Sequence, residues 1–210
     1  MKKLDPTLYL VTNSDGMNEA DFLNTVALAC EGGVTLVQLR EKNLTGREYY
    51  HRALKVKTVT DKYNVPLIID DRVDIALAVD ASGVHLGQTD LPIAAARAMM
   101  GRDKIVGATA KTIEQAKEAE TTGADYLGVG AIYPTKTKVI TVLTPVETLA
   151  DIAKAVKIPV IAIGGLNAEN LTPLYGSGAE GLAVVRAIME SKAPKEAAAE
   201  LLKLAHELCG

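Results

Sequence analysis

Apolar segments of four or five residues alternate with longer stretches of helical periodicity along the whole 210-residue chain. Most of these segments are nearly continuous apolar runs, as expected for strands that are covered on both faces. We expect strands over 8–12, 36–40, 66–69, 83–86, 105–109, 126–129, 160–163 and 181–184. We expect helices over 19–31, 45–63, 74–79, 92–100, 113–122, 146–156, 168–175 and 194–208.

Eight strand and helix pairs in 210 residues match a (β/α)8 TIM barrel of the α/β class, near the lower end of its usual size. No proline-rich, glycine/serine-rich or charged linker divides the chain, so we expect a single catalytic domain over residues 1–210. The alternative is an open, doubly wound sheet. In either architecture the carboxyl ends of the parallel strands share one face, and polar residues there would form one pocket.

The overall charge argues against nucleic acid as a partner. The chain has 23 basic and 26 acidic residues, with a formal charge of -3, and it lacks the basic excess that nucleic-acid binding requires. Tryptophan is absent, which argues against a platform for stacking bases. Cys30 and Cys209 lie far apart and lack metal-ligand spacing. No apolar span of membrane length occurs, so we expect a cytoplasmic enzyme without a membrane partner.

The second expected strand ends in a polar cluster suited to phosphate. Gln38 and Arg40 interrupt an otherwise apolar run, and the pleat turns both side chains to the same side, toward the barrel mouth. Arginine offers a planar fork of donors to phosphate oxygens, and Lys42 can add a mobile charge just beyond the strand. The alternative is a solvated charge cluster on a surface loop.

Carboxylates follow the third and fourth strands, at Asp70, Asp71 and Asp90. Mg²⁺ typically binds one or two carboxylates together with substrate phosphates and water, so we favour Asp71 and Asp90 as ligands of Mg²⁺ beside a diphosphate. The alternative is that Asp70 or Asp71 caps the next helix, but for capping we favour Asp74. His85 lies inside a strand, and we expect a packed, hydrogen-bonded core residue rather than a base.

Two further segments suit a second phosphate. The segment after the sixth strand, 134–138, combines the hydroxyls of Thr135 and Thr137 with the ammonium groups of Lys136 and Lys138. The seventh and eighth strands end in 164–165, a Gly-Gly pair, and in 185–186, a Val-Arg pair, where such barrels commonly bind phosphate. A basic surface loop and a tight glycine turn are the respective alternatives.

Together these segments resemble the thiamine phosphate synthase family over essentially the whole chain. The resemblance is carried by QLREK at 38–42, IIDDR at 68–72, GVHLGQTDLP at 83–92, GVGAIYPTKTK at 128–138, IAIGGLN at 161–167 and VVRAI at 184–188. It implies a transferase that joins hydroxymethylpyrimidine diphosphate to a thiazole phosphate with Mg²⁺, yielding thiamine phosphate and diphosphate. It implies a dissociative route, in which the thiazole nitrogen captures a pyrimidine cation and no protein nucleophile is needed.

The resemblance also implies roles for individual residues. The pyrimidine diphosphate would be bound by Gln38, Arg40, Lys42, Asp70, Thr109 and Lys138. Four of these would be catalytic: Arg40, Lys42, Thr109 and Lys138. The thiazole phosphate would be bound by Thr135, Thr137, Gly165, Val185 and Arg186. Mg²⁺ would be bound by Asp71 and Asp90.

The chain departs from the family pattern at three of these positions. Asp70 stands where Asn is common, and Thr109 and Arg186 stand where Ser is common. Arg186 changes both size and charge, so its side chain would either add a phosphate contact or point away while the backbone alone binds. The segment 139–143 also lacks the acidic residue that often follows the Lys138 equivalent.

Two other functions compete with the synthase. The related thiazole tautomerase has a similar fold, but typically carries histidine where Lys111 stands and lacks a loop like PTKTK. A non-catalytic barrel that binds a phosphorylated ligand would keep Gly164 and Gly165, but would not need Asp71 and Asp90 together. The sequence leaves open whether the chain acts alone or as a homodimer.

Overall fold

The computed structural model describes residues 4–135 and 142–209. Eight parallel strands close into a barrel in chain order, each pairing with the next and β8 with β1. The strands are β1 (Leu8–Val11), β2 (Leu36–Leu39), β3 (Leu67–Asp70), β4 (Gly83–Leu86), β5 (Ile105–Ala110), β6 (Tyr126–Gly130), β7 (Val160–Ile163) and β8 (Gly181–Val184). The expected barrel is confirmed, and the open sheet is excluded by the pairing of β8 with β1.

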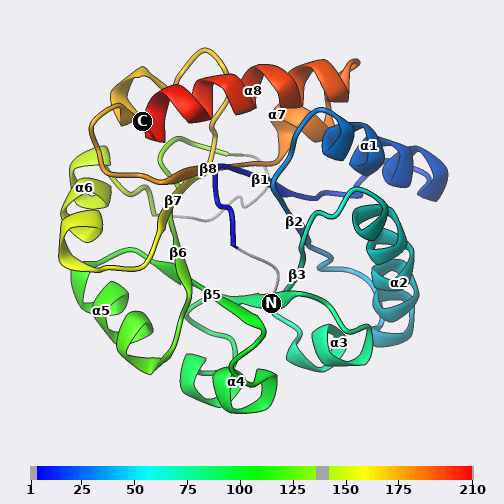
Figure 1. Ribbon diagram of the computed structural model, residues 1–210, viewed down its shortest axis with the longest axis horizontal. Coiled ribbons are helices and arrows are strands. Elements are labelled where there is room, and N and C mark those ends of the chain that lie inside the picture. Colours follow the sequence, from blue (N-terminus) through cyan, green and yellow to red (C-terminus); the bar gives the residue numbers. More distant parts are fainter. Residues whose placement is uncertain (1–3, 136–141, 210) are drawn as a thin grey trace.

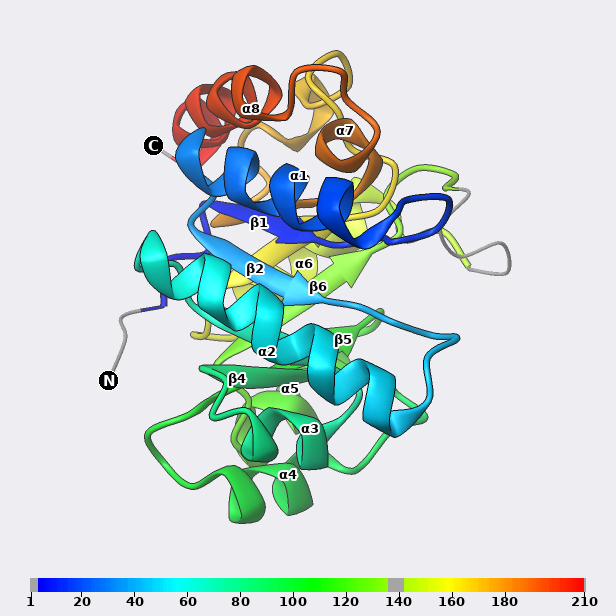
Figure 2. The same cartoon turned by 90° about the vertical axis from the view of Figure 1, so that its right-hand side faces the viewer.

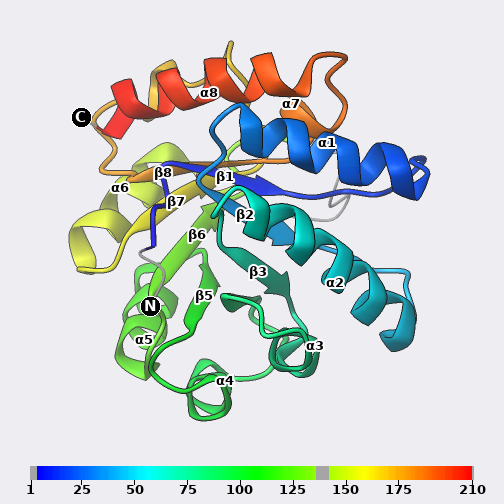
Figure 3. The same ribbon diagram turned by 45° about the vertical axis from the view of Figure 1, so that its right-hand side comes forward.

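Helices surround the barrel, as the view along its axis shows (Figure 1). They are α1 (Glu19–Glu31), α2 (Gly46–Lys62), α3 (Val73–Ala78), α4 (Ile93–Met100), α5 (Ile113–Thr122), α6 (Val146–Ala155), α7 (Arg186–Met189) and α8 (Pro194–Cys209), with a 3₁₀ turn η1 (Thr172–Leu174). Figure 3 shows α1 between α8 and α2 on the outside of the barrel. No helix within the described residues is long and apolar enough to cross a membrane.

Two elements differ from the expected ones. The helix expected over 168–175 is wrong, because only η1 forms there. Asn170 accepts a hydrogen bond from the Asn167 backbone and donates one to the Gly165 carbonyl, and such local bonds compete with helix formation. Pro173 removes another donor. The short helix α7, directly after β8, was not expected as a separate element.

The start of α3 also differs from expectation. Its N-cap is Arg72, which makes no capping bond through its side chain, so the expectation that Asp74 caps this helix is wrong. Asp74 instead lies in the first turn and accepts hydrogen bonds of 2.8 and 2.5 Å from the Arg72 guanidinium. A carboxylate in the first turn still interacts favourably with the positive end of the helix dipole.

Strand alternation divides the buried residues into two sets. Residues that face outward, such as Leu10, Leu39 and Ile69, pack against the helices. Residues that face inward fill the barrel: Tyr9, Val11, Leu36, Ile68, Ile105, Tyr126, Ile161 and Ala183. Because this inner set includes Tyr9 and Tyr126, two hydroxyl groups lie in contact within the barrel interior.

Gly107 makes room for the Tyr126 ring, since a Cβ on Gly107 would lie 2.1 Å from Tyr126 Cζ. We therefore expect Gly107→Ala to lower the free energy of unfolding by about 1–3 kcal/mol, as overpacking does. Gly46→Ala is the control, because its Cβ would lie 3.5 Å from the nearest atom, at Arg72. Urea denaturation should show a loss for Gly107→Ala alone; equal stability of the two variants would contradict this packing.

Candidate active site

The polar residues selected from the sequence gather at the carboxyl ends of the strands. Figure 2 shows β1, β2 and β6 pointing toward one end of the molecule. Gln38, on β2, and Asp70, on β3, face into the barrel, because they alternate with Leu39 and Ile69 that pack against the helices. Both are largely shielded, with 4% and 7% of their surfaces exposed.

Lys42 joins two carboxylates at the barrel mouth. Its Nζ lies 2.8 Å from Asp70 Oδ2 and donates a hydrogen bond to Asp71. Arg40 Nε lies 3.9 Å from the same Asp70 oxygen. The Arg40 and Lys42 side chains remain 20% and 43% exposed, so both cations can still reach an anionic ligand.

This pairing changes the acidity of both partners. Burial raises the pKa of the Asp70 carboxyl to about 6, and the Asp71 charge adds to the rise while Lys42 and Arg40 oppose it. For Lys42, burial lowers the pKa, but Asp70 and Asp71 outweigh it and the net pKa is raised. Lys42 therefore stays charged at neutral pH, whereas Asp70 titrates close to it.

Asp71 and Asp90 lie together, as expected from the sequence. The Asp71 backbone is left-handed, with φ of 60°, and its N–H donates to the His85 carbonyl at 2.9 Å. Asp90 Oδ2 accepts a hydrogen bond of 2.7 Å from the Gly87 backbone, which fixes its side chain. Burial raises the pKa of the Asp90 carboxyl, and a hydrogen bond with Asp71 and the Asp71 charge raise it further.

Asp71 and Asp90 would suit Mg²⁺ that is also bound by a diphosphate better than Mg²⁺ bound by protein side chains alone. Two neighbouring carboxylates that repel each other gain from a shared divalent cation. Among the described residues, however, no three His, Cys, Asp or Glu side chains lie together as a metal site. Asp71 and Asp90 could therefore hold Mg²⁺ only if further ligands come from water and from a phosphorylated ligand.

The residues assigned to the thiazole phosphate lie on adjoining loops. Gly165 has φ of 70°, and a Cβ there would lie 2.8 Å from Tyr133 Cβ, so the loop after β7 packs against the loop that carries Thr135. Tyr133 strengthens this contact by donating from its hydroxyl to the Asn170 carbonyl at 2.9 Å. Thr137 and Lys138 lie outside the described residues, and so does Lys136.

Val185 and Arg186 follow β8 directly, and Arg186 begins α7. The Arg186 side chain points along this helix, because its Nε donates to Glu190 Oε1 at 2.7 Å. It is 44% exposed. Of the two placements left open by the sequence, the structure has the side chain directed to Glu190; the role of the backbone stays a prediction.

A chain of hydrogen bonds crosses the barrel interior below this mouth. Gln38 Nε2 donates to Tyr9 Oη at 2.6 Å, Tyr9 Oη lies 2.7 Å from Tyr126 Oη, and His85 Nδ1 lies 3.0 Å from Tyr126 Oη. His85 Nε2 lies 3.0 Å from Thr109 Oγ1. His85 is thus a buried, hydrogen-bonded residue, as expected, and burial lowers its pKa to about 4.

Sequence reasoning missed Tyr9 and Tyr126, although a signal was present. Both lie in nearly continuous apolar strands, at positions that alternation assigns to the barrel interior, where a tyrosine hydroxyl requires a partner. Burial raises the pKa of each hydroxyl well above its usual value, so both are neutral.

Glu41 is a second omission. Its side chain is 6% exposed, and it accepts hydrogen bonds of 2.9 Å from Arg52 on α2 and from Ser14 in the loop after β1. The Arg52 guanidinium also lies over the Phe22 ring of α1, 5.3 Å from its centroid. Glu41 thereby links the chain after β2 to α2 directly and, through Arg52, to α1. The QLREK motif contains Glu41, but the sequence assigned it no role, because its partners Ser14 and Arg52 are distant in sequence.

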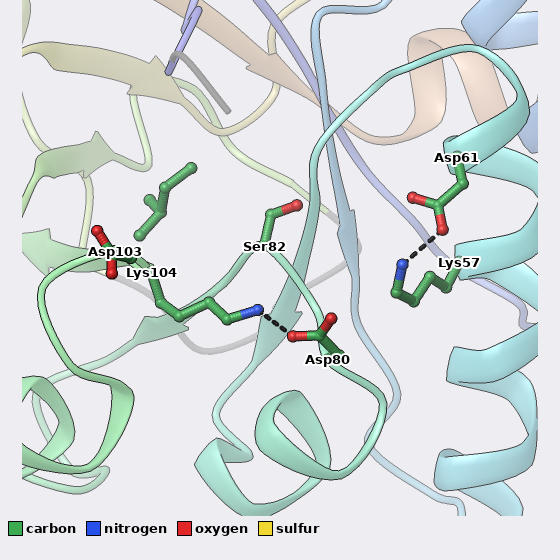
Figure 4. Close-up of a pocket in the computed structure, with 7 residues that line it drawn as sticks. Lys57, Asp61, Asp80, Ser82, Asp103 and Lys104 are labelled. Carbon is green, nitrogen blue, oxygen red and sulfur yellow. Dashed lines mark hydrogen bonds and ion pairs between the residues drawn. The ribbon is translucent and has the colours of Figure 1, made fainter. Parts of the chain in front are cut away.

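A cavity of about 290 Å³ lies at the opposite end of the barrel, where β4 and β5 begin (Figure 4). It is lined by Lys57, Asp61, Asp80, Ser82, Asp103, Lys104 and Ile105. Both ammonium groups are already paired, Lys57 with Asp61 at 2.5 Å and Lys104 with Asp80. This end of a TIM barrel generally serves stability, and we assign the cavity no chemistry.

The raised pKa of Asp70 predicts how stability varies with pH. The folded chain holds this proton up to about pH 6, whereas the unfolded chain loses it near pH 4, so stability falls as pH rises between these values. Asp70→Asn should remove this slope and stabilise the fold at pH 7 by on the order of 2 kcal/mol.

Urea denaturation at pH 4.5 and 7, without divalent cations, measures the effect. Asp74→Asn is the control. The hydrogen bond from Arg72 lowers the pKa of Asp74, so this variant should keep the fall in stability with pH that we attribute to Asp70. An unchanged slope in Asp70→Asn would contradict the assignment.

Comparison with known proteins places the chain in a family. A model described as thiamine monophosphate synthase matches residues 8–188. The thiamine-phosphate synthase of Methanobrevibacter smithii is 54% identical over 203 residues, which cover 97% of each chain. Thiamine-phosphate synthase 2 of Streptococcus pneumoniae is 52% identical over 201 residues and covers 96% of each.

Solved structures agree with these matches. A thiamine phosphate pyrophosphorylase from Pyrococcus furiosus superposes with a TM-score of 0.88 at 39% identity, covering 99% of this chain and 100% of its own. A 3-hexulose-6-phosphate synthase, with a TM-score of 0.69 and 20% identity, shares only the fold. The chain therefore belongs to the thiamine monophosphate synthase family.

Proposed function

We propose that the chain joins 4-amino-2-methyl-5-(diphosphooxymethyl)pyrimidine to 4-methyl-5-(2-phosphooxyethyl)thiazole, with release of diphosphate and formation of thiamine phosphate. The chain is a thiamine-phosphate synthase by its relatives, which are identical to it at about half of the aligned positions over nearly their full length. The observation that carries the proposal is the cluster of Lys42, Asp71 and Asp90, where two carboxylates and an ammonium group lie together after the strands β2, β3 and β4.

The leaving diphosphate would lie between the cations and the acidic pair. Arg40 and Lys42 neutralise its charge from the β2 side, and Lys138 is assigned to the same group by the family resemblance. Mg²⁺, when bound by Asp71 and Asp90, would stabilise the charge that develops on the leaving oxygens. Lys42 can move from its carboxylate partners to the phosphate, because it already stands between two anions and is half exposed.

The thiazole phosphate would bind across the pocket. Gly165 and Thr135 would supply backbone and hydroxyl donors from adjoining loops, and the backbone at Val185 and Arg186 would supply a third edge. Thr137, which lies outside the described residues, is assigned to the same phosphate by the family resemblance. A phosphate held there would leave the thiazole ring directed toward the pyrimidine. The two rings would meet over the inner layer that contains Tyr9 and Tyr126.

The barrel interior suits a reaction through a cation without a protein nucleophile. His85 and the two inner tyrosines are neutral at physiological pH, so none of them competes with the thiazole nitrogen as a charged nucleophile. Their burial also keeps water away from the floor of the pocket. Shielding matters here because water would capture the cation.

The competing functions fit less well. The tautomerase typically has a histidine at position 111, but Lys111 stands there and donates to the Val142 carbonyl at 2.6 Å. A non-catalytic barrel would gain nothing from the repelling carboxylates of Asp71 and Asp90. A cytoplasmic location and a homodimer stay predictions from the sequence.

Asp71→Asn tests the acidic pair. The amide fits the left-handed backbone but removes a charge from the metal site, so turnover should fall by about 100-fold or more with the fold intact. Diphosphate release is measured with both substrates, with and without Mg²⁺. Asp74→Asn is the control and should keep wild-type turnover. Wild-type turnover in Asp71→Asn would refute the metal site, and release from one substrate alone would refute the reaction.

Arg186→Ser tests the departure beside the thiazole phosphate. Because Glu190 holds the guanidinium, we expect the Michaelis constant for the thiazole phosphate to stay within about twofold. Glu190→Gln is the companion variant, since it releases the guanidinium without removing it. A rise for this substrate alone in Arg186→Ser would instead place the side chain on the phosphate.

A further inference from the structure

The hydrogen-bond chain in the barrel interior has a direction. It runs from Gln38 on β2 through Tyr9, Tyr126 and His85 to Thr109 on β5, so five strands contribute one group each. Every member except Thr109 is buried. Each hydroxyl has one proton to donate, and a neutral imidazole has one donor and one acceptor nitrogen. A choice of donor at one end therefore fixes every bond to the other end.

The orientation of the Gln38 amide makes that choice. With Nε2 donating to Tyr9, the Tyr9 hydroxyl is left to donate to Tyr126, and Tyr126 to His85 Nδ1. His85 then carries its proton on Nε2 and donates to Thr109 Oγ1. The opposite order in the Tyr9–Tyr126 bond would leave the buried Tyr9 proton without an acceptor among the described residues, which is costly.

The two ends then differ in what they offer a ligand. Gln38 donates to Tyr9 through Nε2, which leaves its Oε1 as an acceptor at this end of the hydrogen-bond chain. Thr109 accepts from His85, so its own proton is left to be donated, and the residue is partly exposed. One acceptor and one donor are thus left at opposite ends of the hydrogen-bond chain.

The chain carries direction rather than charge. The ring nitrogens of His85 contact the neutral hydroxyls of Tyr126 and Thr109, and both tyrosine hydroxyls contact neutral groups, so these bonds need no charge on any member. A neutral imidazole is required, since an imidazolium would donate from both nitrogens and break the order.

We propose that Tyr9, Tyr126 and His85 are positioning residues that orient Gln38 and Thr109 to read an aminopyrimidine, with Gln38 Oε1 accepting from the amino group and the Thr109 hydroxyl donating to a ring nitrogen. The identity of the ring rests on the proposed function. The direction of the chain does not, because it follows from the contacts within the protein.

The His85 tautomer tests the direction without any substrate. ¹⁵N NMR of the full-length protein, with His85 identified by its loss in His85→Gln, should show the proton on Nε2. Tyr126→Phe removes the donor to Nδ1, so the signal should shift toward a mixture of tautomers. A wild-type proton on Nδ1 would mean the reverse direction and would overturn the proposal.

Kinetics test the positioning role. Tyr126→Phe and Tyr9→Phe should each raise the Michaelis constant for the pyrimidine diphosphate by about 5- to 10-fold, the effect of about one hydrogen bond, while that for the thiazole phosphate stays within about twofold. If Tyr126→Phe does not fold, Tyr9→Phe still tests the positioning role. Equal changes for both substrates, or none, would overturn the positioning role.

Tyr49→Phe is the matched control. Tyr49 is equally buried, but its hydroxyl donates to the backbone carbonyls of Leu39 and Asp70 and takes no part in the hydrogen-bond chain from Gln38 to Thr109. Its loss should lower stability while leaving the His85 tautomer and the ratio of the two Michaelis constants unchanged. A wild-type protein without turnover would count against the proposed function alone, and the tautomer would still decide the direction of the chain.

Discussion

Closure of the barrel is the constraint on which the rest of this structure depends. Once β8 pairs with β1, every second residue of each strand is enclosed, and residues remote in sequence must fit one another. Gly107 has no side chain because the Tyr126 ring occupies its space. In the same enclosed space, Gln38 bonds to Tyr9, and Tyr126 joins Tyr9 to His85. The residues that fill the barrel interior are therefore also the ones that satisfy its polar groups.

The mouth of the barrel follows a different logic. There, like charges lie close together: Asp71 repels both Asp90 and Asp70, and Lys42 only partly offsets this repulsion at Asp70. A buried carboxylate with competing neighbours costs stability, and such costs are typical of sites prepared for a charged ligand. In the proposed function, the neutral interior would bind an uncharged ring, and the charged residues at the mouth would bind the phosphate groups.

Much of this could be predicted from the sequence, because alternation and strand ends are local signals. All eight strands, and the face shared by Arg40, Lys42, Asp71 and Asp90, follow from apolar runs and from the residues after them. What could not be predicted depends on contacts across the barrel. Tyr9 and Tyr126 are 117 residues apart, and nothing near either one indicates the other. The helix expected over 168–175 was lost to side-chain bonds of Asn170 that no periodicity reveals.

The left-handed backbone at Asp71 restricts which residues this position can accept. Asn, Asp and Gly tolerate such a conformation, whereas branched or bulky side chains pay a steric penalty. A carboxylate there must therefore come from Asp: Glu would carry the same charge on a longer arm and a less tolerant backbone. Substitution at this position is therefore limited by backbone geometry as well as by charge, and Asn or Gly would keep the turn while removing the carboxylate.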